Sequence, residues 1–285
     1  MLDNYKLERK VTNNFINVKL GLLIPPFFLL LLLCSYFFIF NDVENYIAGY
    51  VNIQKDLFFY LNGKLSGFPN LQFNLTQLGD VLIFFPIITF FIIYAPKIWE
   101  ALLTSAILSL VVSAILKKLF SVPRPAAIFD NESFVIIGKT LTGRTSLPSG
   151  HSITVFIVIT ILLFAFMPKR NKYKISWSLL IFTLGFVITF SRVGVGAHYP
   201  LDIIIGSTIG YIVAILGIHI NNQVGWCAWI KNKKYYPIFI LLLVIWGGVI
   251  VTKILANNLV IFYFSLLSLV VSLYLITRAY VQRKH

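Results

Sequence analysis

The sequence predicts an all-α fold, a polytopic bundle of helices that cross a membrane. Of its 285 residues, 58% are hydrophobic and only 12% are charged, whereas about 25% of the residues in a soluble domain are charged. Long apolar runs alternate with short polar segments along the chain. A helix needs about 20 apolar residues to cross a bilayer, so the chain is expected to be embedded in a membrane.

Eight apolar runs are predicted to be membrane spans. They cover residues 20–40, 78–94, 101–119, 153–166, 175–190, 203–218, 237–253 and 259–276. The first run is longer than the core of a signal peptide and lacks a small-residue cleavage site, so it is expected to remain as a helix. Residues 95–100 are expected to form a tight turn, and Asp80 is expected to be a charge at a helix end.

The spans divide the chain into two predicted parts. Residues 1–236 contain six spans and form the predicted core, and residues 237–285 add a helical hairpin of unassigned role. In the mixed segment 41–77, one helical face is formed by Leu57, Phe58, Leu61 and Leu65. This segment is expected to form a helix that either lies along the membrane surface or packs against the bundle.

Polar residues gather in three segments at the ends of predicted spans. These segments are Lys117 with Arg124-Pro125, then Pro148-Ser149-Gly150-His151, and then Ser191-Arg192 with His198 and Asp202. Lys118, the next residue, is the alternative to Lys117. Because an even number of spans separates the segments, all three are expected on one side of the membrane.

His198 and Asp202 lie in the connection between the fifth and sixth spans. Pro200 suits the first turn of the sixth helix, so Asp202 is expected one turn deeper than His198 and on the same face. Its carboxylate can accept a hydrogen bond from one imidazole nitrogen, which leaves the other nitrogen free as a nucleophile. A polar cluster that merely ends two helices is the alternative for this pair.

Together, the three segments resemble the signature of the type 2 phosphatidic acid phosphatase (PAP2) superfamily. That signature is Lys, six residues and Arg-Pro; then Pro-Ser-Gly-His; then Ser-Arg, five residues, His, three residues and Asp. Every fixed position is filled between Lys117 and Asp202. The resemblance is to the membrane lipid phosphatases of the superfamily, and it implies a covalent histidine mechanism.

The chemistry of a phosphate ester calls for the same residues. Lys117, Arg124 and Arg192 supply three cations for the phosphoryl oxygens. Ser149 and Gly150 begin the fourth helix, where unpaired backbone N–H groups favour an anion, and Ser149 can donate a hydroxyl or cap the helix.

The two histidines are expected to differ in role. His198, oriented by Asp202, is suited to in-line attack on phosphorus and to forming a phosphohistidine. His151 would protonate the leaving oxygen and then activate the hydrolytic water.

Neither a metal nor another cofactor is expected, because the acidic residues on this side are scattered and the three cations fill the role of metal ions. The net charge of +14 does not indicate nucleic-acid binding, because the cations lie in loops between apolar runs. The expected partner is a membrane lipid phosphate, and the oligomeric state is left open.

Most of the 24 lysines and arginines fall on one side when both termini are placed inside. The positive-inside rule therefore predicts cytoplasmic termini and an active site on the outer face of a plasma membrane. A composition rich in Ile, Phe, Leu, Asn and Lys suggests a bacterial source, and with it the bacterial inner membrane.

The expected function is hydrolysis of a phosphomonoester or diphosphate headgroup. Undecaprenyl diphosphate, phosphatidylglycerophosphate, phosphatidic acid and a lipid A phosphate are the candidate substrates. A phosphotransferase that passes the same phosphoryl group to a second lipid would show the same motifs. A transporter is disfavoured, because its site should lie near the middle of the bilayer.

Overall fold

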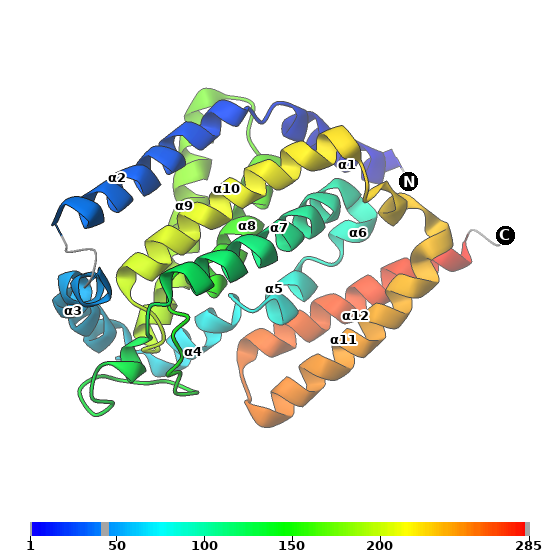
Figure 1. Ribbon diagram of the computed structural model, residues 1–285. Helices are drawn as coiled ribbons and strands as arrows, with labels where there is room; N and C mark the ends of the chain where they lie inside the picture. Colours follow the sequence, from blue (N-terminus) through cyan, green and yellow to red (C-terminus); the bar gives the residue numbers. More distant parts are fainter. Residues whose placement is uncertain (1, 41–45, 283–285) are drawn as a thin grey trace.

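The computed structural model describes residues 2–40 and 46–282, and in these residues it contains helices and no strand (Figure 1). The α-helices are α1 Leu2–Ile16, α2 Ile24–Phe40, α3 Tyr46–Leu65, α4 Pro69–Gln77, α5 Val81–Ile87, α6 Phe91–Tyr94, α7 Pro96–Phe120, α8 Gly150–Ala165, α9 Asn171–Gly194, α10 Pro200–Val224, α11 Tyr236–Ala256 and α12 Val260–Val281. Short 3-10 turns include η1 Leu20–Leu23, η3 Pro125–Ala127 and η4 Ala228–Lys231. Six helices are long and apolar enough to cross a membrane, so the protein is an integral membrane protein.

Two sequence expectations about the second and third spans are wrong. Residues 95–100 are not a turn, because α7 begins at Pro96, where the missing N–H of proline costs nothing. The span expected over residues 78–94 is broken into α5 and α6, with Pro86 inside α5. Proline removes a backbone donor, so a carbonyl of α5 loses its helical partner, and the helix ends one residue after Pro86.

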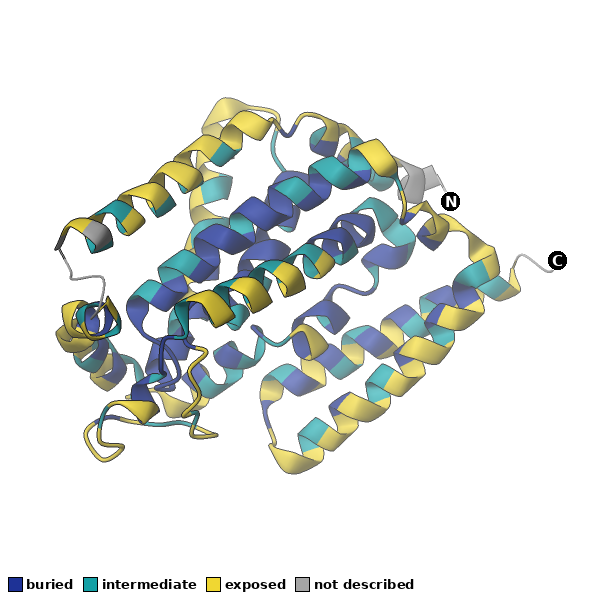
Figure 2. Cartoon of the chain, in the orientation of Figure 1, coloured by how far each residue is buried: buried dark blue, intermediate teal, exposed yellow. Residues whose placement is uncertain are grey.

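Helix α10 is the centre of the bundle, and it packs closely on α8 and α7. A Cβ atom at Gly206 would lie 2.7 Å from the carbonyl oxygen of Ser149, and one at Gly210 would lie 2.6 Å from that of Ile153. Glycines four residues apart thus let two membrane helices approach closely. Figure 2 shows α8 and α10 largely buried, whereas α2 and α11 expose most of their surface.

The C-terminal hairpin supplies hydrogen bonds that the broken segment lacks. Pro86 cannot donate to the carbonyl of Leu82, four residues earlier, and the indole N–H of Trp246 in α11 donates to that oxygen instead at 2.9 Å. The hydroxyl of Ser265 in α12 donates to the carbonyl of Ile83 at 2.7 Å. Unpaired carbonyls are costly at membrane depth, so the hairpin stabilises α5 directly.

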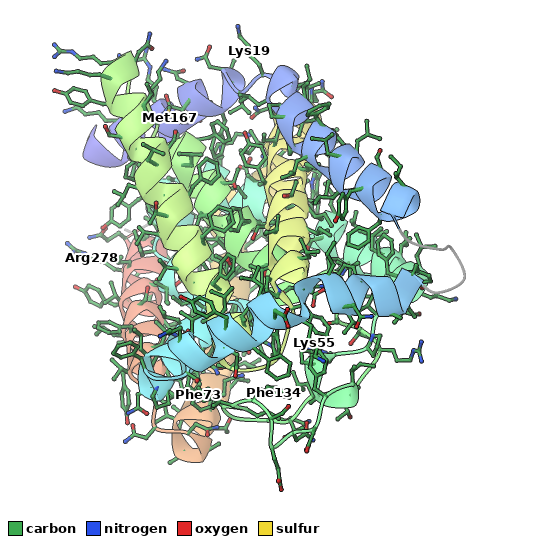
Figure 3. All side chains as sticks on the ribbon, turned by 90° about the vertical axis from the view of Figure 1, so that its left-hand side faces the viewer. Lys19, Lys55, Phe73, Phe134, Met167 and Arg278 are labelled. Carbon is green, nitrogen blue, oxygen red and sulfur yellow. The ribbon has the colours of Figure 1, made fainter. Side chains whose placement is uncertain are left out.

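Helix α3 packs against the bundle, and Figure 3 shows it crossing the ends of α9 and α10. Its buried face carries the polar residues Tyr50, Gln54 and Asn62 together with Phe58. Leu57, expected on that face, is 51% exposed. The buried face of α3 is therefore largely polar, and it differs from the apolar face that the sequence pattern predicted.

Candidate active site

The three motif segments meet at one end of the bundle. The guanidinium Nη1 of Arg124 lies 3.2 Å from His198 Nε2, which joins the first and third segments. The backbone N–H of Ser149 donates to the carbonyl of Asp202 at 3.2 Å, which joins the second and third. A Cβ atom on Gly150 would lie 3.3 Å from Lys117 Nζ. The structure therefore gathers all the predicted site residues around one point, and Lys118 is exposed outside it.

The Asp202 carboxylate is fully buried and is held by four donors. Its Oδ2 lies 3.2 Å from His198 Nδ1, 2.5 Å from the hydroxyl of Ser146 and 3.0 Å from the backbone N–H of Tyr199. The hydroxyl of Tyr50 in α3 donates to Oδ1 at 2.6 Å. These bonds fix the carboxylate, and the sequence analysis missed both Ser146 and Tyr50.

The neighbours of His198 determine which nitrogen carries the hydrogen. An ionised Asp202 can only accept, so Nδ1 of His198 donates to it. Arg124 can only donate, so Nε2 of His198 presents its lone pair. The ring is therefore in the form in which Nε2 is free of hydrogen and faces the cations.

The imidazole of His198 is 1% exposed. Burial lowers its pKa well below the usual range, and the positive charges of Arg124, Arg192 and Lys117 lower it further. The ring is therefore neutral at pH 7, and its Nε2 lone pair is available without loss of a proton.

Arg192 lies in the last turn of α9 and is only 7% exposed. Its Nη1 donates to the hydroxyl of Thr76 in α4 at 2.6 Å, and its buried Nε has no partner among the described residues. A buried guanidinium with an unused donor costs free energy. Such a donor is suited to an anionic oxygen of a ligand.

Ser149 caps α8, one of its two expected roles. Its Oγ accepts from the hydroxyl of Ser152 at 3.0 Å and from the backbone N–H of Ser152 at 3.4 Å. The first backbone N–H groups of α8, at Gly150 and His151, lack partners within the helix. The positive end of the helix and these donors favour a phosphate beside Lys117.

The ring of His151 packs against Gly79, in the turn between α4 and α5. A Cβ atom at Gly79 would lie 2.5 Å from His151 Cδ2, so only glycine fits there. The next residue, Asp80, caps α5 by accepting from the N–H of Leu82 at 2.9 Å, as expected of a helix-end charge. It also pairs with Lys253 of α11 at 2.9 Å, so the hairpin reaches the wall of the site.

No group of three or more His, Cys, Asp or Glu residues lies close enough to hold a metal ion in the ranges that the structure describes. Around the histidines the neighbours are cations instead, since Lys117, Arg124 and Arg192 act electrostatically on both His151 and His198. The arrangement is therefore suited to a multiply charged anion.

Comparison with known proteins matches residues 99–226 to the PAP2 superfamily model. An undecaprenyl-diphosphatase of Sulfolobus acidocaldarius is 28% identical over 202 residues, which cover 69% of this chain and 91% of the relative. The undecaprenyl-diphosphatase BcrC of Bacillus subtilis is 29% identical over 112 residues, 39% of this chain and 52% of that protein. The crystal structure of Aquifex aeolicus LpxE has a TM-score of 0.48 and 26% identity, and covers 59% of this chain and 95% of LpxE. The matched residues 99–226 contain all three motif segments, so the similarity to the PAP2 superfamily falls on the candidate active site.

Proposed function

We propose that this lipid phosphatase hydrolyses a diphosphate headgroup through a phosphohistidine on His198, with undecaprenyl diphosphate as the first substrate to test. The observation that carries the proposal is the orientation of His198, whose Nδ1 is held by Asp202 while Nε2 faces Arg124. The names of two curated relatives support the choice of lipid.

In the first step, Lys117, Arg124 and Arg192 hold the terminal phosphoryl oxygens together with the N–H groups of α8. The Nε2 lone pair of His198 attacks phosphorus, and the bond from phosphorus to the leaving oxygen breaks. The negative charge of the bound headgroup offsets the cations and favours a protonated His151. His151 transfers this proton to the leaving oxygen, so the lipid leaves as a monophosphate.

In the second step, a water molecule attacks the phosphohistidine. His151, now neutral, takes the proton of the water as its oxygen bonds to phosphorus. The bond between phosphorus and Nε2 breaks, and inorganic phosphate leaves. Asp202 stabilises the positive imidazole during both steps.

The substrate test is phosphate release by the purified protein in detergent. Undecaprenyl diphosphate, phosphatidylglycerophosphate, phosphatidic acid and lipid A phosphate are compared, each with and without EDTA. We expect the highest kcat/KM on undecaprenyl diphosphate and the same rate with EDTA, because side-chain cations neutralise the phosphate. A rate that falls with EDTA and recovers with a divalent ion would contradict the metal-independent mechanism. A preference for another lipid would correct the substrate only.

We further propose that the site lies on the outer face of the membrane, which the distribution of lysines and arginines along the sequence supports. The test uses two exposed lysines at opposite ends of the bundle, Lys139 in the loop before α8 and Lys169 before α9. In intact cells, an impermeant thiol reagent is expected to label Lys139→Cys and not Lys169→Cys. The natural Cys227 is buried, and unsubstituted protein gives the background from Cys34. The reverse labelling pattern would invert the orientation.

A further inference from the structure

A cavity of about 1010 Å³ lies at the end of the bundle opposite the candidate active site. We call it the basal cavity, and its lining includes Lys19, Leu163, Lys169, Lys174, Phe182 and Tyr211. It is bounded by the segment from α1 to η1, the end of α8, the first half of α9 and the middle of α10. Figure 3 shows Lys19 and Met167, two lining residues, at the end remote from α3.

The basal cavity is positively charged. Lys19 and Lys169 are exposed and Lys174 is half-buried, and none of the three has a carboxylate partner in the part of the chain that the structure describes. The lining contains no Asp or Glu. Three uncompensated cations around one cavity attract an anion.

Deeper in the bundle, the wall of the same cavity is apolar. Phe164 of α8, Phe182 of α9 and Tyr211 of α10 form it, with the Tyr211 ring centroid 6.5 Å from that of Phe164 and 5.9 Å from that of Phe182. The cavity thus changes from cationic at the membrane surface to aromatic toward the membrane interior. A phospholipid shows the same order from headgroup to chain.

Side-chain hydrogen bonds join two of the elements that line the cavity. The amide of Asn14 in α1 donates to the carbonyls of Ala165 at 2.9 Å and Met167 at 3.3 Å, at the end of α8. These bonds fix α1 on the bundle and pair carbonyls that the helix end would leave free. A ligand therefore finds a cavity that is already formed.

We propose that the basal cavity binds an anionic phospholipid from the leaflet opposite the candidate active site. The phosphate lies among Lys19, Lys169 and Lys174, and an acyl chain follows Phe182 and Tyr211. A soluble anion would leave the aromatic wall uncovered, and the ammonium of a zwitterionic lipid would meet three like charges. The volume is at the upper end for ligand cavities, so the headgroup and the first part of the chains fit.

The experiment is native mass spectrometry of the purified protein in detergent, to which phosphatidylglycerol or phosphatidylcholine is added. The quantity measured is the affinity of the protein for each lipid. The test variant combines K19Q, K169Q and K174Q, and the control combines K172Q, K233Q and K234Q. The control residues are exposed lysines at the same end of the bundle as the basal cavity, and none of them lines the cavity. We expect phosphatidylglycerol affinity to fall about tenfold or more in the test variant only, since each lysine near an anionic headgroup contributes.

A second variant tests the apolar part with all lysines present. S178W places a large ring in the cavity and is expected to abolish phosphatidylglycerol binding as well. Equal losses in the test and control triples, equal binding of phosphatidylcholine, or unchanged binding in S178W would each overturn the proposal. Displacement of the lipid by millimolar inorganic phosphate would also overturn it, because the cavity would then be a simple anion site. Phosphate release in lipid-free detergent is expected to be unchanged in all variants, which separates this site from the proposed function.

Discussion

Replacing His198 with alanine is expected to reduce phosphate release to background, a loss of about 10⁴-fold or more, because the attacking atom itself is removed. The sharper measurement is the covalent intermediate. With substrate labelled in its terminal phosphate, rapid denaturation should trap label on wild-type protein in a form stable to alkali and labile to acid, as expected of a nitrogen–phosphorus bond. His198→Ala should trap none.

His151→Ala is the matched control for that experiment. Because His151 is assigned to proton transfer, its loss should slow both steps but leave Nε2 of His198 able to attack. The variant should therefore carry label although it releases little phosphate. Label on His198→Ala would remove His198 as the nucleophile. Absence of label from His151→Ala, under conditions where the wild type is labelled, would contradict the role assigned to His151.

Replacing Gly79 with alanine is expected to lower kcat by about 10- to 100-fold, because displacement of a catalytic group by about 1 Å can cost that much. The added Cβ would lie 2.5 Å from His151 Cδ2, so the ring must move. The effect should fall mainly on kcat, because the three cations that hold the phosphate lie outside α8. Steady-state kinetics on the preferred lipid measures both constants.

Gly63→Ala provides the control, since a Cβ there meets nothing within 4 Å. Labelled intermediate distinguishes a displaced His151 from a misfolded protein. Gly79→Ala should still form the phosphohistidine and turn it over slowly, as His151→Ala does. A wild-type kcat in Gly79→Ala would show that the packing of His151 on this turn does not matter for the reaction.

The predicted site residues could be found from sequence because each lies in a short polar segment at the end of an apolar run. The spacing of His198 and Asp202 also predicted their contact, which the structure shows at 3.2 Å. Tyr50 could not be found in this way. It contacts Asp202 from 152 positions away, and it lies on a helix face whose apolar pattern was misleading.

The helices were predictable for a different reason, since α7 to α12 follow continuous apolar runs. The helix predicted as the fourth span, α8, has 16 residues and is shorter than the six helices long enough to cross a membrane. The second span was the exception. Pro86 was visible in the sequence, but the sequence does not show which groups pair with the carbonyls around it. In the structure Trp246 and Ser265 donate to carbonyls of α5, from helices that the sequence pattern does not connect with α5.

The bond from Trp246 to the carbonyl of Leu82 also sets an order of assembly. Its two partners are 164 positions apart, so the ribosome completes α5 long before it makes the donor. Until α11 and α12 enter the bilayer, α5 has carbonyls that lipid cannot satisfy. The carbonyl of Leu82, three residues after Gly79, therefore gains this partner only after α11 has been synthesised and inserted.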